Sequence, residues 1–178
     1  MSKEAAKNEN IVLIGFMGCG KSSVGRLIAE KLRYRFVDTD QSIVRETGVP
    51  ISEIFATHGE DHFRDLETEV LESLRDKRGL VIATGGGIVT RVRNLPLLRE
   101  LGFVAWLNAD EDVIFERVSR NKRRPLLQTE NPRETIHKLL VERLPMYQGA
   151  AQITIDTGAG SHDEIADAVI RAARASAA

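Results

Sequence analysis

One stretch of the chain carries the residue types and spacing of a phosphate-binding loop. Residues 15–22 read Gly-Phe-Met-Gly-Cys-Gly-Lys-Ser and match the pattern G-x-x-x-x-G-K-[ST]. Glycines in such a loop let backbone N–H groups converge on phosphate oxygens, and the N-terminus of a following helix adds partial positive charge. We predict that Lys21 reaches the β- and γ-phosphates of a nucleotide and that the Ser22 hydroxyl ligates Mg²⁺. The alternative is a chance glycine-rich turn with a solvated lysine.

Two acidic residues could serve a metal and an acceptor. Asp38 and Asp40 flank Thr39 directly after an apolar segment, and ligands bind at the carboxyl ends of strands in open α/β sheets. Because side chains alternate along an extended chain, the two carboxylates are expected to point in different directions. One can then serve Mg²⁺ through its water shell while the other faces an acceptor hydroxyl. Two aspartates that cap a loop are the alternative.

Three consecutive glycines could bring backbone close to a small substrate. Gly85, Gly86 and Gly87 follow Thr84 at the end of another apolar segment. A residue without a Cβ permits close approach of the main chain, although glycine-rich turns without a function are frequent. The glycines therefore indicate a ligand-binding turn only in combination with other residues.

Arginines could supply positive charge to an anionic substrate. Arg64 has Glu60 four residues before it and Glu67 three residues after it. This spacing fits either a solvent-facing ion pair on a helix or a guanidinium that Glu67 orients toward a substrate carboxylate. The same question is open for four arginines farther along the chain, Arg117, Arg123, Arg124 and Arg143. An arginine that closes over transferring phosphoryl oxygens would stabilise their charge in the transition state.

The elements that must position these residues alternate between apolar runs and amphipathic stretches, which is typical of a parallel sheet covered on both faces. Strands are predicted over residues 11–14, 34–37, 80–83, 103–107 and 152–156. Helices are predicted from Lys21 onward, over residues 59–77, around 136–144 and around 165–170, the last two after N-terminal capping signals. The polar stretches 38–60 and 119–132 are predicted as long loops, which are usually functional or disordered.

Composition limits the class of protein. The chain has 178 residues, 25 Lys and Arg, 26 Asp and Glu, a formal charge of −1 and 42% hydrophobic residues. We therefore expect one globular domain over residues 1–178, with a disordered tail at 1–10. The near-neutral charge argues against nucleic-acid binding through phosphates. No apolar run reaches the roughly 20 residues of a membrane span, and no targeting peptide is evident.

The single cysteine and the lack of heptads complete these expectations. Cys19 cannot form an internal disulfide, which fits a reducing compartment and excludes a zinc site built from several cysteines. We interpret Cys19 as a small filler of the phosphate loop, because no histidine lies nearby in the sequence to activate a thiol. We expect a cytoplasmic protein, since no targeting peptide is evident. We expect a monomer, since the charge is near neutral and no coiled-coil heptads are present.

Taken together, these residues resemble the shikimate kinase family, from about residue 10 to residue 170. The resemblance depends on an ordered series of short motifs rather than on the phosphate loop alone. The motifs are G-F-M-G-C-G-K-S-S-V-G at 15–25, D-T-D at 38–40, I-F at 54–55, G-E at 59–60, F-R at 63–64, Glu67, T-G-G-G at 84–87, R-P-L-L at 124–127, and E-R at 142–143 with Pro145 and Tyr147.

The resemblance implies an α/β fold of the nucleoside-monophosphate-kinase type. Its parts are a five-stranded parallel sheet flanked by helices, a substrate-binding segment at about 38–66 and a mobile lid at about 119–132. The implied reaction transfers the γ-phosphoryl group of ATP to the 3-hydroxyl of shikimate, with Mg²⁺ as cofactor, in aromatic amino-acid synthesis.

The resemblance also implies roles for single residues. Lys21, Asp40 and Arg124 are the implied catalytic residues, with Asp40 on the acceptor hydroxyl and Arg124 over the phosphates. Ser22 and Asp38 are implied at Mg²⁺. Asp40 is the implied contact to the shikimate hydroxyl, and Arg64 and Arg143 are the implied contacts to its carboxylate. The backbone of Gly85, Gly86 and Gly87 is implied to line the ring. The implied contacts to the nucleotide are Gly18, Cys19, Gly20, Lys21, Ser22, Ser23, Arg124 and, along the adenine, Arg117.

One departure and two alternatives stay open. His162 stands where the family often has a proline beside adenine, so the resemblance does not assign the contacts to the adenine base. We predict that His162 lies in a loop or at the start of a helix. A kinase of the same fold could instead act on gluconate or a nucleoside monophosphate. The chain could also be a non-catalytic nucleotide-binding regulatory module, although such a module would be expected to lose Lys21, Asp38 or Asp40.

Overall fold

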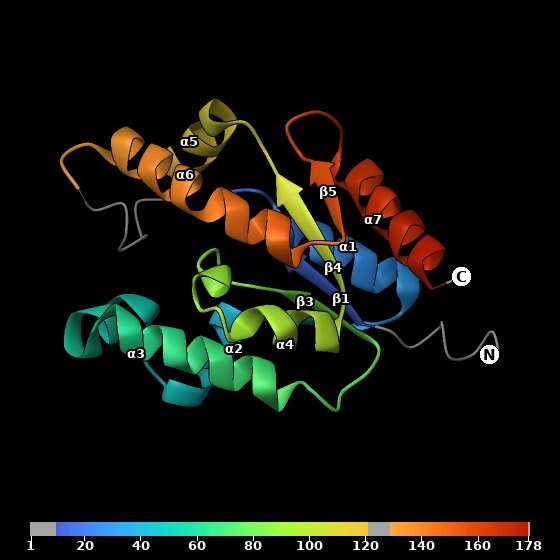
Figure 1. The fold of residues 1–178 in the computed structure, drawn as a ribbon, viewed down its shortest axis with the longest axis horizontal. Coiled ribbons are helices and arrows are strands. Elements are labelled where there is room, and N and C mark those ends of the chain that lie inside the picture. The colour runs from blue at the N-terminus through green and yellow to red at the C-terminus, as the bar shows by residue number, and fades with distance from the viewer. Residues whose placement is uncertain (1–9, 121–128, 178) are drawn as a thin grey trace.

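The computed structural model describes residues 10–120 and 129–177. These residues form three layers, in which helices cover both faces of one five-stranded sheet (Figure 1). The strand order is β2-β3-β1-β4-β5, and every neighbouring pair is parallel. The strands are β1 (Asn10–Ile14), β2 (Arg35–Asp38), β3 (Leu80–Ala83), β4 (Gly102–Asn108) and β5 (Ile153–Asp156). The predicted five-stranded parallel sheet is therefore confirmed, with strand ends within one residue of those predicted.

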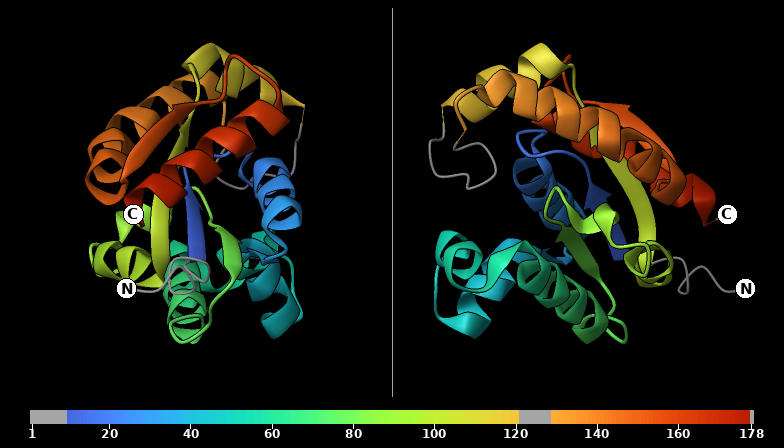
Figure 2. Two further views of the ribbon diagram at one scale, coloured as in Figure 1. Left: turned by 90° about the vertical axis from the view of Figure 1, so that its right-hand side faces the viewer. Right: turned by 60° about the vertical axis from the view of Figure 1, so that its left-hand side comes forward.

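The helices divide between the two faces of the sheet (Figure 2). One face is covered by α1 and α7, and the other by α4 and α6, with α3 packed against α4. The helices are α1 (Lys21–Leu32), α2 (Thr39–Thr47), α3 (Ile51–Ser73), the short 3-10 helix η2 (Ile88–Thr90), α4 (Asn94–Leu101), α5 (Glu111–Ser119), α6 (Pro132–Ala150) and α7 (His162–Ser176). No helix in these ranges is both long and apolar enough to cross a membrane.

The central strand β1 separates two hydrophobic cores. Ile11 and Leu13 pack toward α1 and α7, whereas Val12 and Ile14 pack toward α3 and α4. Alternate side chains of a strand point to opposite faces, so a strand buried on both faces must be apolar throughout. This two-sided burial explains why β1, β3 and β4 were predictable from continuous apolar runs, whereas the edge strands β2 and β5 are only partly buried.

Asn10 fixes the start of β1. Its side chain is fully buried and donates to the carbonyls of Lys77 and Leu101, each at 2.8 Å, while its Oδ1 accepts from the N–H of Leu80 at 3.0 Å. The prediction of a disordered tail is wrong at residue 10, because these hydrogen bonds make Asn10 part of the sheet. Residues 1–9 lie outside the described residues.

The segment predicted as a polar loop at 38–60 is helical, so that prediction is wrong. The Asp38 side chain caps α2 by accepting from the N–H of Gln41 at 3.1 Å, and Gly48 ends the helix in the left-handed region with φ 75°. Helix α3 begins at Ile51, well before the predicted start at residue 59, and is interrupted at Gly59 (φ 82°, ψ 175°). These short helices bury few apolar residues, so they show little hydrophobic periodicity. The helices α4 and α5 were also not predicted, although α4 buries Leu97, Leu98 and Leu101 at helical spacing.

The second predicted loop, 119–132, is described only at its ends. Helix α5 ends at Ser119, and α6 begins at Pro132 after Asn131, whose side chain caps the helix by accepting from the N–H of Glu134. Residues 121–128, including Arg123 and Arg124, lie outside the described residues. The start predicted for α6 is confirmed.

Candidate active site

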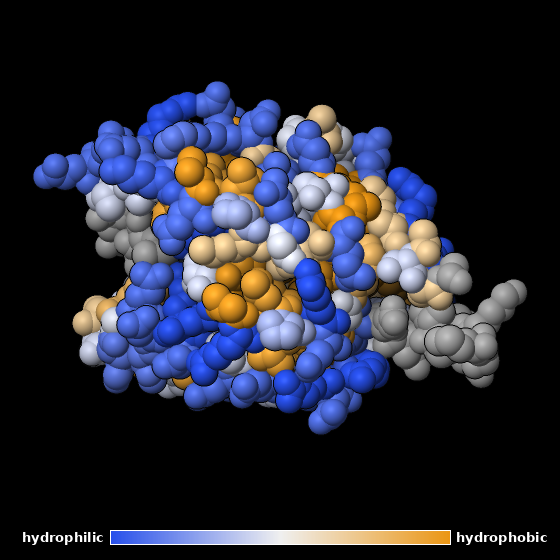
Figure 3. Space-filling view, viewed as in Figure 1, coloured by the Kyte–Doolittle hydropathy of each residue, from blue (hydrophilic) through white to orange (hydrophobic). Residues whose placement is uncertain are grey.

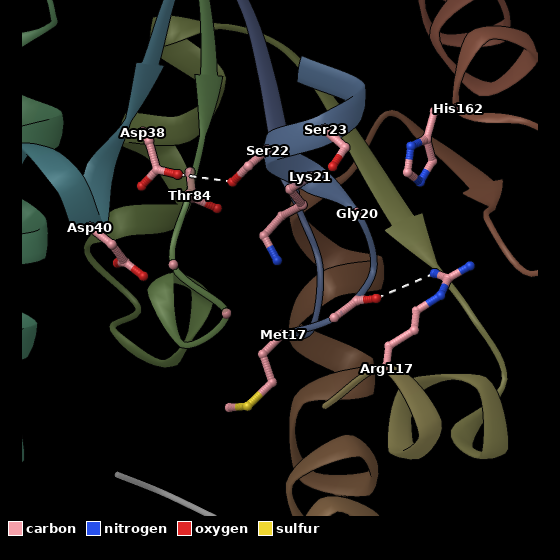
Figure 4. Close-up of a pocket in the computed structure, with 13 residues that line it drawn as sticks. Met17, Gly20, Lys21, Ser22, Ser23, Asp38, Asp40, Thr84, Arg117 and His162 are labelled. Atoms are coloured by element: carbon pink, nitrogen blue, oxygen red, sulfur yellow. Dashed lines mark hydrogen bonds between the residues drawn. The ribbon is translucent and has the colours of Figure 1, made fainter. Parts of the chain in front are cut away.

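The phosphate loop connects β1 to α1, as its motif requires. Gly20 caps α1 with φ 87° in the left-handed region, and a Cβ on Gly15 would lie 2.3 Å from the Leu107 carbonyl oxygen. Glycine is therefore needed at both positions. The Lys21 ammonium donates to the carbonyls of Gly15 at 2.6 Å and Phe16 at 2.8 Å, which holds it across the loop. Figure 4 shows this side chain pointing into the cavity beside the loop.

We call this cavity of about 410 Å³ the donor cavity. Its charged and polar side chains come from α1, β2, α2, α5 and α7 and from the turn after β3 (Figure 4). Its lining residues are Met17, Gly18, Gly20, Lys21, Ser22, Ser23, Asp38, Asp40, Thr84, Gly85, Gly86, Arg117 and His162. Cys19 is buried in the loop, and burial raises the pKa of its thiol. An uncharged, buried thiol agrees with its interpretation as a filler.

Ser22 and Asp38 meet at the edge of the donor cavity. The Ser22 hydroxyl donates to Asp38 Oδ2 at 2.9 Å, while Asp38 Oδ1 caps α2. The carboxylate therefore performs the capping role and still presents its other oxygen to the cavity. Mg²⁺ prefers hydroxyl and carboxylate oxygens and usually keeps several waters and phosphate oxygens as further ligands. The pair fits that chemistry, although the described residues hold no cluster of three or more His, Cys, Asp or Glu.

Arg117 and His162 lie on the opposite side of the donor cavity (Figure 4). Arg117 donates to the carbonyls of Gly18 at 3.3 Å and Thr157 at 2.9 Å, and so connects the phosphate loop with the loop after β5. His162 is the first residue of α7, as predicted, and its Nε2 lies 3.6 Å from where a Cβ on Gly20 would stand. It therefore also lines the cavity, which the helix-start prediction did not include.

A second cavity of about 540 Å³ adjoins the donor cavity, and we call it the acceptor cavity. Met17, Asp40, Gly85 and Gly86 line both cavities. Its remaining lining residues are Val44, Gly48, Val49, Pro50, Ile51, Ser52, Phe55, Phe63, Arg64, Glu67, Gly87 and Arg143. Asp40 thus lies where a group bound in one cavity meets a group bound in the other.

Arg64 is held in place at the acceptor cavity. Its Nη1 donates to Glu67 Oε2 at 2.7 Å, and its Nη2 and Nε donate to Glu60 Oε1 at 2.7 and 3.2 Å. The guanidinium occupies the space that a side chain at Gly87 would fill. Burial disfavours the charged form, but Glu67 and Glu60 together raise the pKa of Arg64. Arg64 is only 4% exposed, so the interpretation as a solvent-facing pair is wrong.

Arg143 of α6 is buried and forms no close ion pair with another described residue. It is 2% exposed, and its Nε and Nη1 have no hydrogen-bond partner among the described residues. The guanidinium lies 5.7 Å from the centre of the Phe16 ring and lines the acceptor cavity. Arg143 acts electrostatically on Glu67 and Tyr147, but buried N–H groups without acceptors are costly, so the site fits an anionic ligand that accepts from them.

Glu67 lines the acceptor cavity beside Arg64. It is fully buried, and its Oε1 has no hydrogen-bond partner among the described residues. A Cβ on Gly85 would lie 2.4 Å from Glu67 Oε1 and 2.8 Å from Asp40 Oδ1, so the two carboxyl groups converge on one point. Burial raises the pKa of Glu67 to about 7, although Arg64 lowers it.

Two residues that sequence reasoning gave no role hold the glycine turn. Thr39 Oγ1 accepts from the N–H of Gly85 at 3.0 Å, and the Tyr147 hydroxyl donates to the Gly86 carbonyl. The position of Thr39 between two aspartates was the available signal for the first. No local pattern pointed to the second, because Tyr147 lies 61 residues away from Gly86.

A glycine-rich loop joins a central parallel strand to a helix, and the acceptor cavity shares the Asp40 carboxylate with the donor cavity beside that loop. This arrangement defines a P-loop kinase of small molecules. The family model for shikimate kinase matches residues 17–174. The chain is 49% identical to the shikimate kinase of Thermodesulfovibrio yellowstonii, over 92% of this chain and 94% of that relative. The chain belongs to the shikimate kinase family.

The solved structures agree with this membership. A shikimate kinase from Acinetobacter baumannii, solved in complex with shikimate, matches with a TM-score of 0.90 and 41% identity over 96% of each chain. A gluconokinase from Sinorhizobium meliloti matches with a TM-score of 0.61 at 21% identity, which shows a common fold alone. The predicted nucleoside-monophosphate-kinase-like P-loop fold is confirmed, and the chain is an ATP-dependent kinase rather than a non-catalytic module.

Proposed function

We propose that this chain transfers the γ-phosphoryl group of ATP to the 3-hydroxyl of shikimate, a step of aromatic amino-acid synthesis. The observation that carries the proposal is the buried guanidinium of Arg143, whose Nε and Nη1 have no hydrogen-bond partner among the described residues, beside Arg64 on the same cavity. A hydroxylated carboxylate supplies an anion for the two arginines and a hydroxyl for Asp40. The A. baumannii relative, named for its complex with shikimate, supports this acceptor.

The donor cavity holds ATP in this proposal. Lys21 meets negative charge on the β- and γ-phosphates, and the loop around Gly18, Cys19, Gly20 and Ser23 surrounds them. Arg117 lies along the adenine. Ser22 and Asp38 hold Mg²⁺, which neutralises charge on the phosphate oxygens when bound.

The acceptor cavity holds shikimate. Gly85, Gly86 and Gly87 line its ring, and Asp40 accepts the proton of the reacting hydroxyl. The hydroxyl oxygen then forms its bond to the γ-phosphorus while the bond from that phosphorus to the bridging oxygen breaks, and ADP leaves with the electron pair. We include Arg124 as the residue that closes over the transferring group, from a lid at about 119–132.

We propose further that the protein acts as a single domain and a cytoplasmic monomer. Figure 3 shows a mainly hydrophilic face in which hydrophobic side chains form separate patches. In the described ranges the large hydrophobic residues with exposed side chains are Val44, Val92, Val141 and Leu144.

The test is ADP release from ATP-Mg²⁺ with a panel of small hydroxy acids, for the wild type and for Arg143→Ala. A charge-assisted hydrogen bond contributes about 1.5–3 kcal/mol, so the KM for shikimate is expected to rise roughly tenfold or more, with the KM for ATP little changed. Arg75→Ala is the matched control, because Arg75 is half exposed and pairs with Glu100. A preference for gluconate, or an unaltered KM for shikimate in Arg143→Ala, contradicts the proposal.

A further inference from the structure

Glu67 is surrounded by charged groups from three elements beneath the acceptor cavity. Arg64 and Glu60 belong to α3, as Glu67 does, and Arg64 donates hydrogen bonds to both glutamates. Asp40 comes from α2 and Arg143 from α6, and both act electrostatically on Glu67. Tyr147 of α6 also lies at this site and donates its hydroxyl to the Gly86 carbonyl. The glycine turn at 85–87 packs against Glu67, Asp40 and Arg64 and contributes only backbone atoms to the cluster.

The two oxygens of Glu67 have different surroundings. Oε2 accepts from Arg64 Nη1 at 2.7 Å, whereas Oε1 is buried and has no hydrogen-bond partner among the described residues. Oε1 lies on the side of Asp40, as their convergence at Gly85 shows. A buried carboxylate oxygen that faces another carboxylate is unfavourable, and a proton on that oxygen removes the repulsion and turns an acceptor into a donor.

The charges of the cluster do not balance when every group is ionised. Arg64 and Arg143 contribute two positive charges, against three negative charges from Asp40, Glu60 and Glu67. An anionic acceptor adds a fourth negative charge and engages the guanidinium groups that otherwise offset Glu67. Neutralising one buried carboxylate is the direct way to accommodate that charge, and Glu67 is the carboxylate that contacts no solvent.

We propose that Glu67 takes up a proton when the acceptor carboxylate binds, so that acceptor affinity is linked to pH through this residue. The proposal rests on the proposed function, because it needs a carboxylate in the acceptor cavity. It assigns Glu67 a role in the proton balance of binding, in addition to the hydrogen bond that orients Arg64.

The expected pH range follows from burial. Because burial raises the pKa of Glu67 to about 7, about half of the free enzyme carries the proton at pH 7. A bound carboxylate places another negative charge beside Glu67 and raises this pKa further. Binding at pH 7 should therefore take up as much as about half a proton, and binding at pH 5.5 almost none. The affinity should fall by up to about tenfold per pH unit above pH 7.

The test is calorimetric titration of the enzyme with shikimate alone, where no turnover occurs. In buffers of different ionisation enthalpy, the slope of the observed enthalpy gives the number of protons taken up. We expect about 0.5 for the wild type at pH 7. Glu67→Gln keeps an acceptor oxygen for Arg64 but cannot titrate, so its slope should be zero and its affinity constant between pH 6 and 8. The control is Glu100→Gln, which changes a carboxylate that is 55% exposed and pairs with Arg75, outside the cluster around Glu67. It should retain the proton uptake.

The outcomes separate this proposal from the proposed function. If the wild type does not bind shikimate, the proposed function fails. Binding by the wild type with a zero slope at both pH 7 and pH 7.5 overturns the role of Glu67 and leaves the function standing. Uptake that persists in a folded Glu67→Gln variant places the proton elsewhere and also overturns it. Should that variant not fold, the wild-type slopes at pH 5.5, 7 and 7.5 decide.

Discussion

Replacing Gly87 by alanine would test the position of Arg64 by steric means alone. Gly87 has φ −95° and ψ 6°, a conformation that alanine adopts without strain. Its new Cβ would lie 2.3 Å from Arg64 Cζ and Nη1 and 2.4 Å from Nη2, whereas ordinary van der Waals contact begins at 3.4 Å. The guanidinium must therefore move by roughly 1 Å, a distance set by this contact limit.

The magnitude follows from the contacts that this movement breaks. Arg64 donates to Glu67 and Glu60 at 2.7 Å, and hydrogen bonds weaken steeply beyond their normal range. A guanidinium displaced by this much cannot also meet the acceptor carboxylate. The loss of a charge-assisted contact of about 1.5–3 kcal/mol corresponds to a rise of roughly 10- to 150-fold in the KM for shikimate.

The assay is steady-state kinetics with each substrate varied in turn, together with thermal unfolding. We expect the KM for ATP to stay within about twofold, because that movement lies in the acceptor cavity. Gly149→Ala is the matched control: it lies in α6 with nothing within 4 Å of an added Cβ, so alanine should stabilise by up to about 1 kcal/mol. A folded Gly87→Ala enzyme with a normal KM for shikimate would refute the placement of Arg64. An unfolded variant would refute the expectation that the Arg64 side chain moves to accommodate the new Cβ.

Three further predictions concern the phosphate loop, the metal ligands and the buried acid. Lys21→Ala should abolish phosphoryl transfer in a protein that still folds, and near-normal turnover would mean that the ammonium does not meet the phosphates. Asp38→Asn keeps a helix cap but removes a charge, so the Mg²⁺ concentration for half-maximal rate should rise roughly tenfold; an unchanged Mg²⁺ dependence would exclude Asp38 as a ligand. For Glu67, the folded-state pKa of about 7 lies above the usual value of 4.5, so the neutral form stabilises the fold below pH 4.5 and this contribution is lost as pH rises through 7. Wild-type stability relative to Glu67→Gln should fall by on the order of 3 kcal/mol between pH 4.5 and pH 8 in denaturant titrations, and parallel pH profiles would contradict this.

The strands and the phosphate loop were predictable because their signals are local. A buried parallel strand is a continuous apolar run, and a phosphate loop is a fixed spacing of glycines before Lys21. The helix α2 and the first part of α3 were missed, because each buries a single apolar residue, Ile43 and Ile54, and so leaves no periodic pattern. The helix α4 was missed although its buried leucines recur at helical spacing. Gly48, within the stretch predicted as a loop, ends α2, and Gly59, where a helix was predicted to begin, interrupts α3.

Residue types and spacing alone predicted the acceptor site only as a set of candidate residues, and it was the family resemblance that implied a common carboxylate for Arg64 and Arg143. The sequence supplied Arg64 and Glu67 as a pair, and the structure adds that both are buried. The meeting of Arg64 with Arg143 in one cavity depends on how α3 and α6 pack, which no spacing of 79 positions can indicate. The convergence of Glu67 and Asp40 on Gly85 likewise depends on tertiary packing.

The ring stack behind the glycine turn gives the protein an optical property. Trp106 is the only tryptophan of the chain, and its ring stacks on Tyr147 with centroids 5.6 Å apart and planes 18° apart. The Tyr147 hydroxyl is bonded to the Gly86 carbonyl, which lies in the wall shared by both cavities. A ligand that displaces this carbonyl therefore changes the surroundings of a single indole two contacts away. The fluorescence of the unlabelled protein, excited at the red edge of tryptophan absorption, reports on the state of this wall without any added dye.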